Sequence, residues 1–327
     1  MSVPLKAREM LKEVHVVNGR EYCCYIKGNC SDDRTADLVF FNGLFSGASS
    51  WAYQTRMPAL LKHYRLVMFD YPCQGGSAAV TEGMTAFDLL QELTVLLTQL
   101  GVKKPLLIGH SVGGMLGGIM AGLHASDHYL QAEIQGLLIA NSGASLPDST
   151  KNLFDDIQAR LMSIHEAGLS APDVRNAIKD VFRSFIPQAL DKGYQEMMLP
   201  FMDDLLEGYA DYNPNPQALA YLLKILSERD TAEKPMMPFL RQATCPVRVV
   251  AGANDRIFPP AKVQEMADAF VNADFFSIAD AGHSVMLEQS RAFNELLLDF
   301  VNRVFGPASV ETGNINFKIT PAIEDRS

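Results

Sequence analysis

The chain has no uncharged apolar stretch long enough to cross a membrane, and its first residues lack the apolar run of a signal peptide. Positive charge is also in short supply, because 28 Lys and Arg residues face 38 Asp and Glu residues, for a formal net charge of −10. Such a balance does not attract phosphate backbones or anionic lipid headgroups. We therefore expect neither a membrane span nor a nucleic-acid partner.

Cysteine is scarce and unevenly spaced. The five cysteines are an odd number, and no Cys-x-x-Cys pair occurs among them. This pattern is typical of free, mostly buried thiols in a reducing compartment rather than of a disulfide framework. It predicts a cytoplasmic protein.

Cofactor-binding motifs are missing as well. No phosphate-binding loop and no Gly-x-Gly-x-x-Gly turn follows a predicted strand. Five scattered histidines show no metal-ligand spacing: His15, His63, His124, His128 and His165. We predict that the protein uses neither a cofactor nor a metal ion.

The chain does contain a regular alternation of apolar runs and helical stretches. Apolar runs of strand length occupy residues 38–41, 66–69, 105–108, 136–140, 247–251 and 274–278. Helical stretches are predicted from Trp51 to Leu61, over about 85–100, and near 291–304. This alternation predicts an α/β fold with a mostly parallel sheet covered by helices on both faces. Asn18-Gly19 lies between two β-rich runs and predicts a hairpin that adds antiparallel strands at one edge.

The alternation breaks between about residues 145 and 240, where amphipathic helical patterns follow one another. An insertion of this length between two sheet strands predicts a helical cap. The expected organisation is an α/β core of residues 1–144 and 241–305, a cap of residues 145–240, and a polar tail of residues 306–327 that is expected to be disordered.

A serine stands at the centre of Gly109-His110-Ser111-Val112-Gly113, between a predicted strand and a predicted helix. The two glycines allow a tight turn that exposes the hydroxyl above the sheet, and the following helix points backbone N–H groups at the same place. A serine hydroxyl needs a base, a group that orients the base, and donors for the developing oxyanion. The setting predicts that Ser111 is a nucleophile, while His110 is expected to be structural.

Two further polar residues follow predicted strands in the order acid, then base. Asp255 lies in a loop before Pro259, and His283 follows the last strand. Alone, each could be an ordinary loop residue. Together with an upstream serine, in the order Ser, Asp, His, they predict a catalytic triad. We expect Asp70 to anchor its own loop rather than to replace Asp255, and Cys73 to be a packed thiol rather than a catalytic one.

These motifs resemble those of the α/β-hydrolase superfamily over roughly residues 14 to 305. The serine pentapeptide, the Gly-x-x-Asp-x-x-x-Pro segment that ends at Pro259, and Gly282-His283 all match the superfamily pattern. The superfamily usually has His-Gly after its third strand, where a backbone N–H completes the oxyanion hole. This chain has Asn42-Gly43-Leu44 there. The resemblance implies that Leu44 and Val112 donate their N–H groups to the oxyanion, with Phe45 as an alternate.

A weaker resemblance points to one branch of that superfamily. Asn-Gly after the third strand and Phe-Asp-x-Pro-x-x-Gly-x-Ser over residues 69–77 are similar to motifs of two enzyme groups. These are the synthases that join two 3-hydroxyacyl groups into a lipid precursor, and the hydroxyacyl-carrier-protein-to-CoA transacylases. That branch carries Ser-x-Trp-Gly-Gly at its nucleophile, whereas this chain has Ser111-Val112-Gly113-Gly114.

The motifs predict a serine-dependent acyl-transfer enzyme that hydrolyses a carboxylic ester or thioester with an apolar acyl chain. If a hydroxyl or thiol replaces water as the acceptor, the protein is an acyltransferase that moves a (3-hydroxy)acyl group. A non-catalytic binding protein on the same scaffold is a third interpretation. The expected partner is a small-molecule acyl ester or thioester, which could be linked to coenzyme A or a carrier protein. The sequence does not indicate an oligomeric state.

Overall fold

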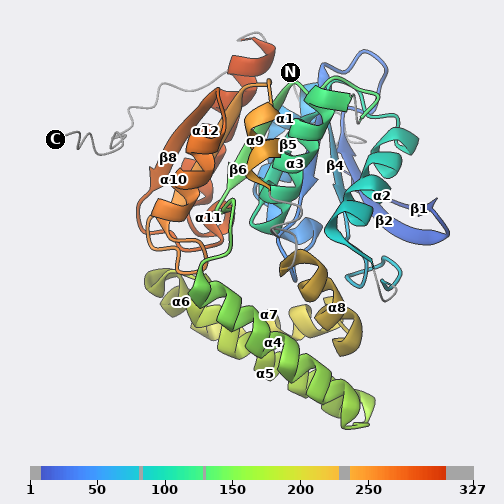
Figure 1. Cartoon of the computed structure of the whole chain (residues 1–327), viewed down its shortest axis with the longest axis vertical. Helices are drawn as coiled ribbons and strands as arrows, with labels where there is room; N and C mark the ends of the chain where they lie inside the picture. The colour runs from blue at the N-terminus through green and yellow to red at the C-terminus, as the bar shows by residue number, and fades with distance from the viewer. Residues whose placement is uncertain (1–8, 81–83, 128–129, 228–235, 307–327) are drawn as a thin grey trace.

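One eight-stranded sheet forms the centre of the molecule, in the order β1-β2-β4-β3-β5-β6-β7-β8. The computed structural model describes residues 9–80, 84–127, 130–227 and 236–306 (Figure 1). The strands are β1 (Leu11–Val17), β2 (Arg20–Gly28), β3 (Ala36–Phe41), β4 (Tyr64–Phe69), β5 (Leu106–His110), β6 (Gly136–Ala140), β7 (Val247–Gly252) and β8 (Ala273–Ile278). The β1–β2 and β2–β4 pairs are antiparallel, and every other pair is parallel.

The antiparallel edge begins with the predicted hairpin. Asn18 and Gly19 connect β1 to β2 and have positive φ angles of 50° and 79°. Two consecutive positive φ angles give the backbone twist that a two-residue hairpin turn requires, and Asn-Gly adopts them at low cost.

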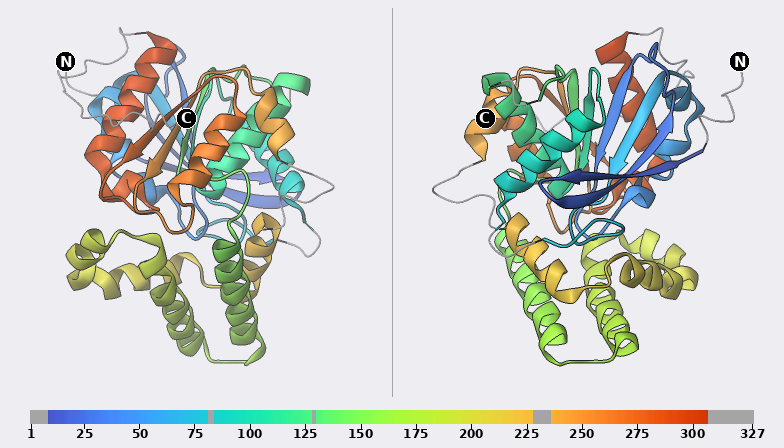
Figure 2. Two further views of the ribbon diagram at one scale, coloured as in Figure 1. Left: turned by 60° about the vertical axis from the view of Figure 1, so that its left-hand side comes forward. Right: turned by 90° about the vertical axis from the view of Figure 1, so that its right-hand side faces the viewer.

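The parallel strands are buried on both faces. In β3, Leu38 belongs to one apolar cluster and Val39 to the other. Helices α2 (Ala86–Gln99), α3 (Val112–Asp127), α9 (Met237–Gln242) and α10 (Pro260–Ala269) cover one face, and α1 (Pro58–His63) and α12 (Ser290–Phe305) cover the other (Figure 2). The predicted α/β class, a mostly parallel sheet between two helical layers, is confirmed. Within the described residues, no helix is both long and apolar enough to cross a membrane.

The helix predicted from Trp51 to Leu61 is wrong in its bounds. The segment forms two short 3-10 turns, η2 (Ala48–Trp51) and η3 (Gln54–Arg56), and an α-helix begins only at Pro58. Proline has no N–H to donate and disfavours the helical conformation in the residue before it. Met57 accordingly has an extended backbone, with φ −70° and ψ 117°, and this residue separates η3 from α1.

A helical cap is inserted between β6 and β7. It contains α4 (Asp148–Glu166), α5 (Ala171–Ala189), α6 (Lys192–Met198), η4 (Leu199–Phe201), α7 (Met202–Tyr212) and α8 (Pro216–Ser227), which lie together beyond one end of the sheet (Figures 1 and 2). The cap has its own apolar cluster, which includes Phe154, Phe182 and Leu206. One member of that cluster, Phe45, comes from the loop after β3 and therefore belongs to the core.

These elements do not establish the predicted boundaries between core and cap. Leu240 of α9 lies within the predicted cap range, yet it packs in the same cluster as Met120 of α3. The limits at 144, 145, 240 and 241 therefore stay a prediction. The predicted disordered tail, apart from Gly306, lies outside the described residues.

A buried carboxylate ties together the amino ends of the central strands. Asp37 of β3 has a fully buried side chain, and its two oxygens lie 2.6 Å from Arg34 Nε and 2.7 Å from Arg65 Nη2. The Lys103 backbone N–H, just before β5, donates to the same carboxylate at 2.7 Å. One anion thus connects β3, β4 and the approach to β5.

We expect Asp37→Ala to lower the free energy of unfolding by about 3–5 kcal/mol, because Arg34 and Arg65 would keep buried charges without a counter-ion. Urea denaturation followed by circular dichroism measures this loss. Asp32→Ala is the control, because the Asp32 side chain is 98% exposed and pairs with Lys103 at the surface. It should leave the free energy of unfolding unchanged, and an equally small effect of Asp37→Ala would contradict the prediction.

Candidate active site

Ser111 occupies a strained turn between β5 and α3. Its φ angle is 53°, in the left-handed region that residues with a side chain avoid. The Ser111 N–H donates to the Ala140 carbonyl at 2.9 Å, and the Ser111 carbonyl accepts from Gly114 N–H at 3.0 Å. These bonds hold the turn in a conformation that raises the hydroxyl above the carboxyl end of the sheet.

Two glycines make this turn possible. A Cβ atom on Gly109 would lie 2.5 Å from the Gly113 carbonyl oxygen, and one on Gly113 would lie 2.3 Å from the Phe41 carbonyl oxygen. Both distances are too short for any side chain, and both obstacles are backbone. The tight turn that the two glycines predict therefore requires glycine at both positions, because the backbone of strand, turn and helix approaches closely there.

Asp255 and His283 meet at the same end of the sheet. Asp255 lies after β7 and His283 after β8, and His283 Nδ1 is 2.9 Å from Asp255 Oδ2. The other carboxylate oxygen accepts the backbone N–H groups of Ile257 and Phe258 at 2.8 and 3.0 Å. A carboxylate can only accept, so it selects the tautomer in which Nδ1 carries the proton and Nε2 is the basic nitrogen.

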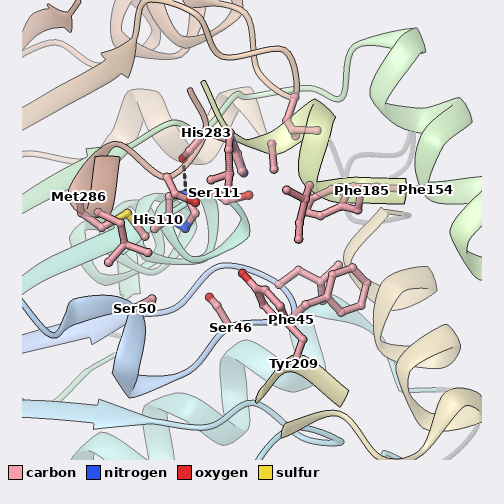
Figure 3. Close-up of a pocket in the computed structure, with 17 residues that line it drawn as sticks. Phe45, Ser46, Ser50, His110, Ser111, Phe154, Phe185, Tyr209, His283 and Met286 are labelled. Carbon is pink, nitrogen blue, oxygen red and sulfur yellow. Dashed lines mark hydrogen bonds between the residues drawn. The ribbon is translucent and has the colours of Figure 1, made fainter. Parts of the chain in front are cut away.

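Ser111 and His283 line one cavity, in which Figure 3 shows them on the same side. In the described part of the chain, no hydrogen bond joins the Ser111 hydroxyl to His283. Catalytic hydrogen bonds are often long in a free enzyme and tighten when substrate binds. The structure thus brings the three predicted residues to one end of the sheet, with the contact between Asp255 and His283 formed.

The predicted oxyanion donors come from the loop after β3 and from the start of α3. Leu44, after β3, lines the cavity, and Val112 is the first residue of α3. Among the described residues, no backbone carbonyl accepts the N–H of Leu44 or Val112. The alternate donor, Phe45, has a positive φ angle of 64° and its ring is buried in the cap cluster.

Two residues outside the predicted site support it through hydrogen bonds. Asn141, after β6, donates to Asp255 Oδ2 at 2.7 Å and to the Gly282 carbonyl at 3.1 Å. Glu288 accepts the backbone N–H groups of Gly282 and Ser284 at 2.9 and 2.7 Å, and burial raises the pKa of its carboxyl. For Asn141, the signal in the sequence that could have identified it is its position. It directly follows a buried apolar run, at the carboxyl end of the sheet where the other site residues lie.

The cap reaches the same loop. The His283 backbone N–H donates to the carbonyl of Ala189, the last residue of α5, at 2.6 Å. The backbone of the histidine is therefore held by Ala189 on the cap side and by Glu288 through its neighbours on the core side.

His110 supports the site from below. Its Nε2 donates to the His283 carbonyl at 2.7 Å, and a Cβ atom on Gly43 would lie 2.5 Å from its Nδ1. Burial, with the nearby His283 ring as a lesser cause, lowers the pKa of His110 from 6.5 to about 3. The ring is therefore a neutral spacer between the loop after β3 and the loop that carries His283, which matches the predicted structural role.

Asp70 and Cys73 lie apart from the cavity that Ser111 lines. The Asp70 carboxylate accepts the hydroxyls of Tyr25 and Tyr212 at 2.9 and 2.5 Å, and burial raises its pKa. Cys73 Sγ accepts the Val80 N–H at 3.0 Å, and burial raises the pKa of its thiol to about 11. Both residues are thus packed anchors, and all five cysteines are free.

The cavity at Ser111 is small and mostly apolar. Its volume is about 60 Å³, and Phe154, Phe185 and Ile186 line it from the cap (Figure 3). A second, more open hollow of about 380 Å³ adjoins it and shares Phe45 and Tyr209 as walls. In the described ranges, no group of three or more His, Cys, Asp or Glu side chains is placed to hold a metal ion.

A strained serine at a strand–helix turn, beneath a helical cap on a mostly parallel sheet, defines an α/β-hydrolase. A model of the alpha/beta hydrolase family matches residues 38–296 of this chain. The chain therefore belongs to the α/β-hydrolase family of enzymes, and the resemblance of its motifs to that superfamily is confirmed.

The chain is distantly similar to several known proteins. The chain is 26% identical over 281 residues to a protein named "Putative carbamate hydrolase RutD" from Caulobacter sp. (strain K31), a match that covers 84% of this chain and 93% of that protein. The enol-lactonase of Burkholderia xenovorans LB400 superposes with a TM-score of 0.73 at 21% identity, over 89% of this chain and 100% of that one. A malate-bound thermophilic esterase from Thermogutta terrifontis superposes with a TM-score of 0.69 at 20% identity, over 91% and 99% of the two chains. At these identities the two structures show the shared fold.

We expect the buried His110 to make the protein less stable in acid. Between pH 6.5 and about 3 the unfolded chain binds a proton at this residue and the folded chain does not. Stability contributed by the neutral ring is present above pH 6.5 and falls by up to about 1.4 kcal/mol per pH unit below it. His110→Gln keeps a donor for the His283 carbonyl but cannot be protonated, so its unfolding free energy should fall less between pH 7 and pH 5.

Urea denaturation at pH 7 and pH 5 measures that difference. His165→Gln, which replaces an exposed histidine of α4, is the matched control and should behave like the unmodified protein. Equal losses of stability in all three proteins would show that His110 is not the group responsible.

Proposed function

We propose that this protein is a serine-dependent acyl-transfer enzyme that hydrolyses a carboxylic ester or thioester with an apolar acyl group. The observation that carries the proposal is the cavity in which a left-handed Ser111 and His283 lie together, with His283 Nδ1 held 2.9 Å from the buried Asp255 carboxylate. A serine in that environment has a base, and the base has an orienting acid.

In the proposed first step, Ser111 Oγ attacks the substrate carbonyl carbon and its proton passes to His283 Nε2. Asp255 stabilises the imidazolium that results, and the N–H groups of Leu44 and Val112 bind the oxyanion. The intermediate collapses, the bond to the leaving group breaks, and that group takes the proton from His283. Water then attacks the acyl-enzyme by the same route, which releases the acid and restores the Ser111 hydroxyl.

The walls of the cavity support an apolar acyl group. Phe154, Phe185 and Ile186 would surround the part of the substrate next to the reacting carbonyl. The names of the relatives refer to a carbamate, an enol-lactone and an ester, all of which carry an acyl carbon bonded to a heteroatom leaving group. Whether the substrate is linked to coenzyme A or to a carrier protein stays a prediction.

Acyl transfer to a hydroxyl or thiol is the second candidate. It is favoured by the small volume of the cavity, about 60 Å³ under the cap, because a narrow cavity leaves little room for water beside an acyl-enzyme. The resemblance of residues 69–77 to the 3-hydroxyacyl synthase and transacylase branch points the same way. The same triad serves both reactions, so the acceptor decides between them.

Ser111→Ala should abolish labelling by a fluorophosphonate probe and lower kcat/KM for p-nitrophenyl acetate by at least about 10³-fold, because it removes the hydroxyl that attacks the carbonyl. Ser50→Ala is the matched control: Ser50 lines the same cavity, but its hydroxyl donates to the Gly47 carbonyl at 2.6 Å. That variant should be labelled and should turn over substrate normally. Absence of labelling in the folded, unmodified protein would favour the non-catalytic interpretation instead.

Incubation with 3-hydroxyacyl thioesters, followed by mass spectrometry, should yield free acid alone if water is the acceptor. Acyl-ester dimers or exchanged thioesters would instead identify the protein as an acyltransferase.

A further inference from the structure

The loop that carries the proposed oxyanion donor is anchored at both ends, once by the core and once by the cap. At its start, the Tyr71 hydroxyl donates to the Asn42 carbonyl at 3.0 Å. At its end, the side-chain amide of Asn213 donates to the Phe45 carbonyl at 3.3 Å. Leu44 lies between these two anchors, so the direction of its N–H depends on both.

Phe45 needs such an anchor because its backbone is strained. Its φ angle of 64° is in the left-handed region, where a residue with a large side chain stays only if its surroundings hold it. Its ring is 2% exposed and packs edge-on against Phe182 of α5, with ring centroids 5.1 Å apart and an interplanar angle of 79°. The cap therefore holds Phe45 by its ring and by its carbonyl.

Asn213 is itself rigidly held where α7 ends. Its amide nitrogen also donates to the Tyr209 carbonyl at 2.8 Å, and its oxygen accepts from Gln74 Nε2 at 2.9 Å. Both Asn213 and Gln74 are fully buried. Next to this pair, Gly75 N–H donates to the Tyr212 carbonyl at 2.8 Å. The bonds around Asn213 thus join the loop after β4, the end of α7 and the loop after β3.

We propose that Asn213 is a positioning residue, which sets the geometry of the oxyanion hole from the cap by fixing the Phe45 carbonyl. The inference rests on the proposed function, in which the Leu44 N–H binds the oxyanion. A donor that is rotated or displaced stabilises the transition state less, while ground-state binding, which depends on the apolar walls, changes little. The cap is then part of the catalytic geometry and does more than cover the pocket.

We expect Asn213→Ala to lower kcat for p-nitrophenyl acetate by about tenfold to hundredfold and to change KM by less than about twofold. The rate constant for phosphonylation of Ser111 by a fluorophosphonate should fall by the same factor, because the phosphonyl oxygen occupies the same donors. Asn213→Asp is nearly isosteric and can still accept from Gln74, but it offers no N–H to Phe45. It should lose activity to a similar extent, and it serves as the test if the alanine variant does not fold.

Asn215→Ala is the matched control. Asn215 lies two residues further on, is exposed, and caps α8 by accepting the Ala218 N–H at 3.0 Å. This variant should lower the melting temperature but leave kcat and the phosphonylation rate constant unchanged. A folded Asn213→Asp protein with unmodified kcat and phosphonylation rate would overturn the inference. It would also be overturned if Asn215→Ala lowered kcat and the phosphonylation rate as much as the Asn213 variants do.

The two proposals fail in different ways. If the proposed function is wrong, the unmodified protein is not labelled at Ser111 at all. If only the role of Asn213 is wrong, the unmodified protein is labelled and the Asn213 variants are labelled just as fast.

Discussion

The close approach of backbone to backbone at the β5–α3 turn is the constraint on which the rest of the structure depends. Gly109 and Gly113 let the turn lie against the end of β3, near enough that a Cβ on Gly113 would lie 2.3 Å from the Phe41 carbonyl oxygen. Parallel strands end at one edge, so the loops after β3, β6, β7 and β8 meet around this turn. This packing holds the proposed nucleophile, Ser111, in place where those loops meet.

Local patterns were sufficient to predict most of the fold. Uninterrupted apolar runs indicated strands buried on two faces, and the sheet places Leu38 and Val39 in different clusters as that interpretation requires. The helix predicted from Trp51 to Leu61 was wrong in its bounds because Pro58 keeps Met57 extended, so η3 ends there and a new helix begins. A break in the sequence pattern indicated the helical cap, while α9, within the predicted cap range, packs on the core, so the limits of the cap stay a prediction.

The candidate site could be predicted only where residues carry a motif. Ser111, Asp255 and His283 stand in a recognisable order. Asn141 instead contacts Asp255 across 114 positions of the chain, so only the tertiary fold brings the two together. Glu288 accepts backbone N–H groups four and six positions away, but it carries no motif. Asn213 is the extreme case, because its contacts with Phe45 and Gln74 span 168 and 139 positions of the chain. No local pattern around Asn213 distinguishes it from the exposed Asn215 nearby.

The hydrogen bond from His283 N–H to the Ala189 carbonyl has a consequence for the modularity of this architecture. A cap that supplies a backbone acceptor to the histidine loop cannot be exchanged between relatives as an independent unit. A transplanted cap of another length would still have to place the last carbonyl of its α5 equivalent where the N–H of the histidine can reach it. Divergence in the substrate pocket is then most easily accommodated on the faces of α4 and α5, with the helix terminus itself kept fixed.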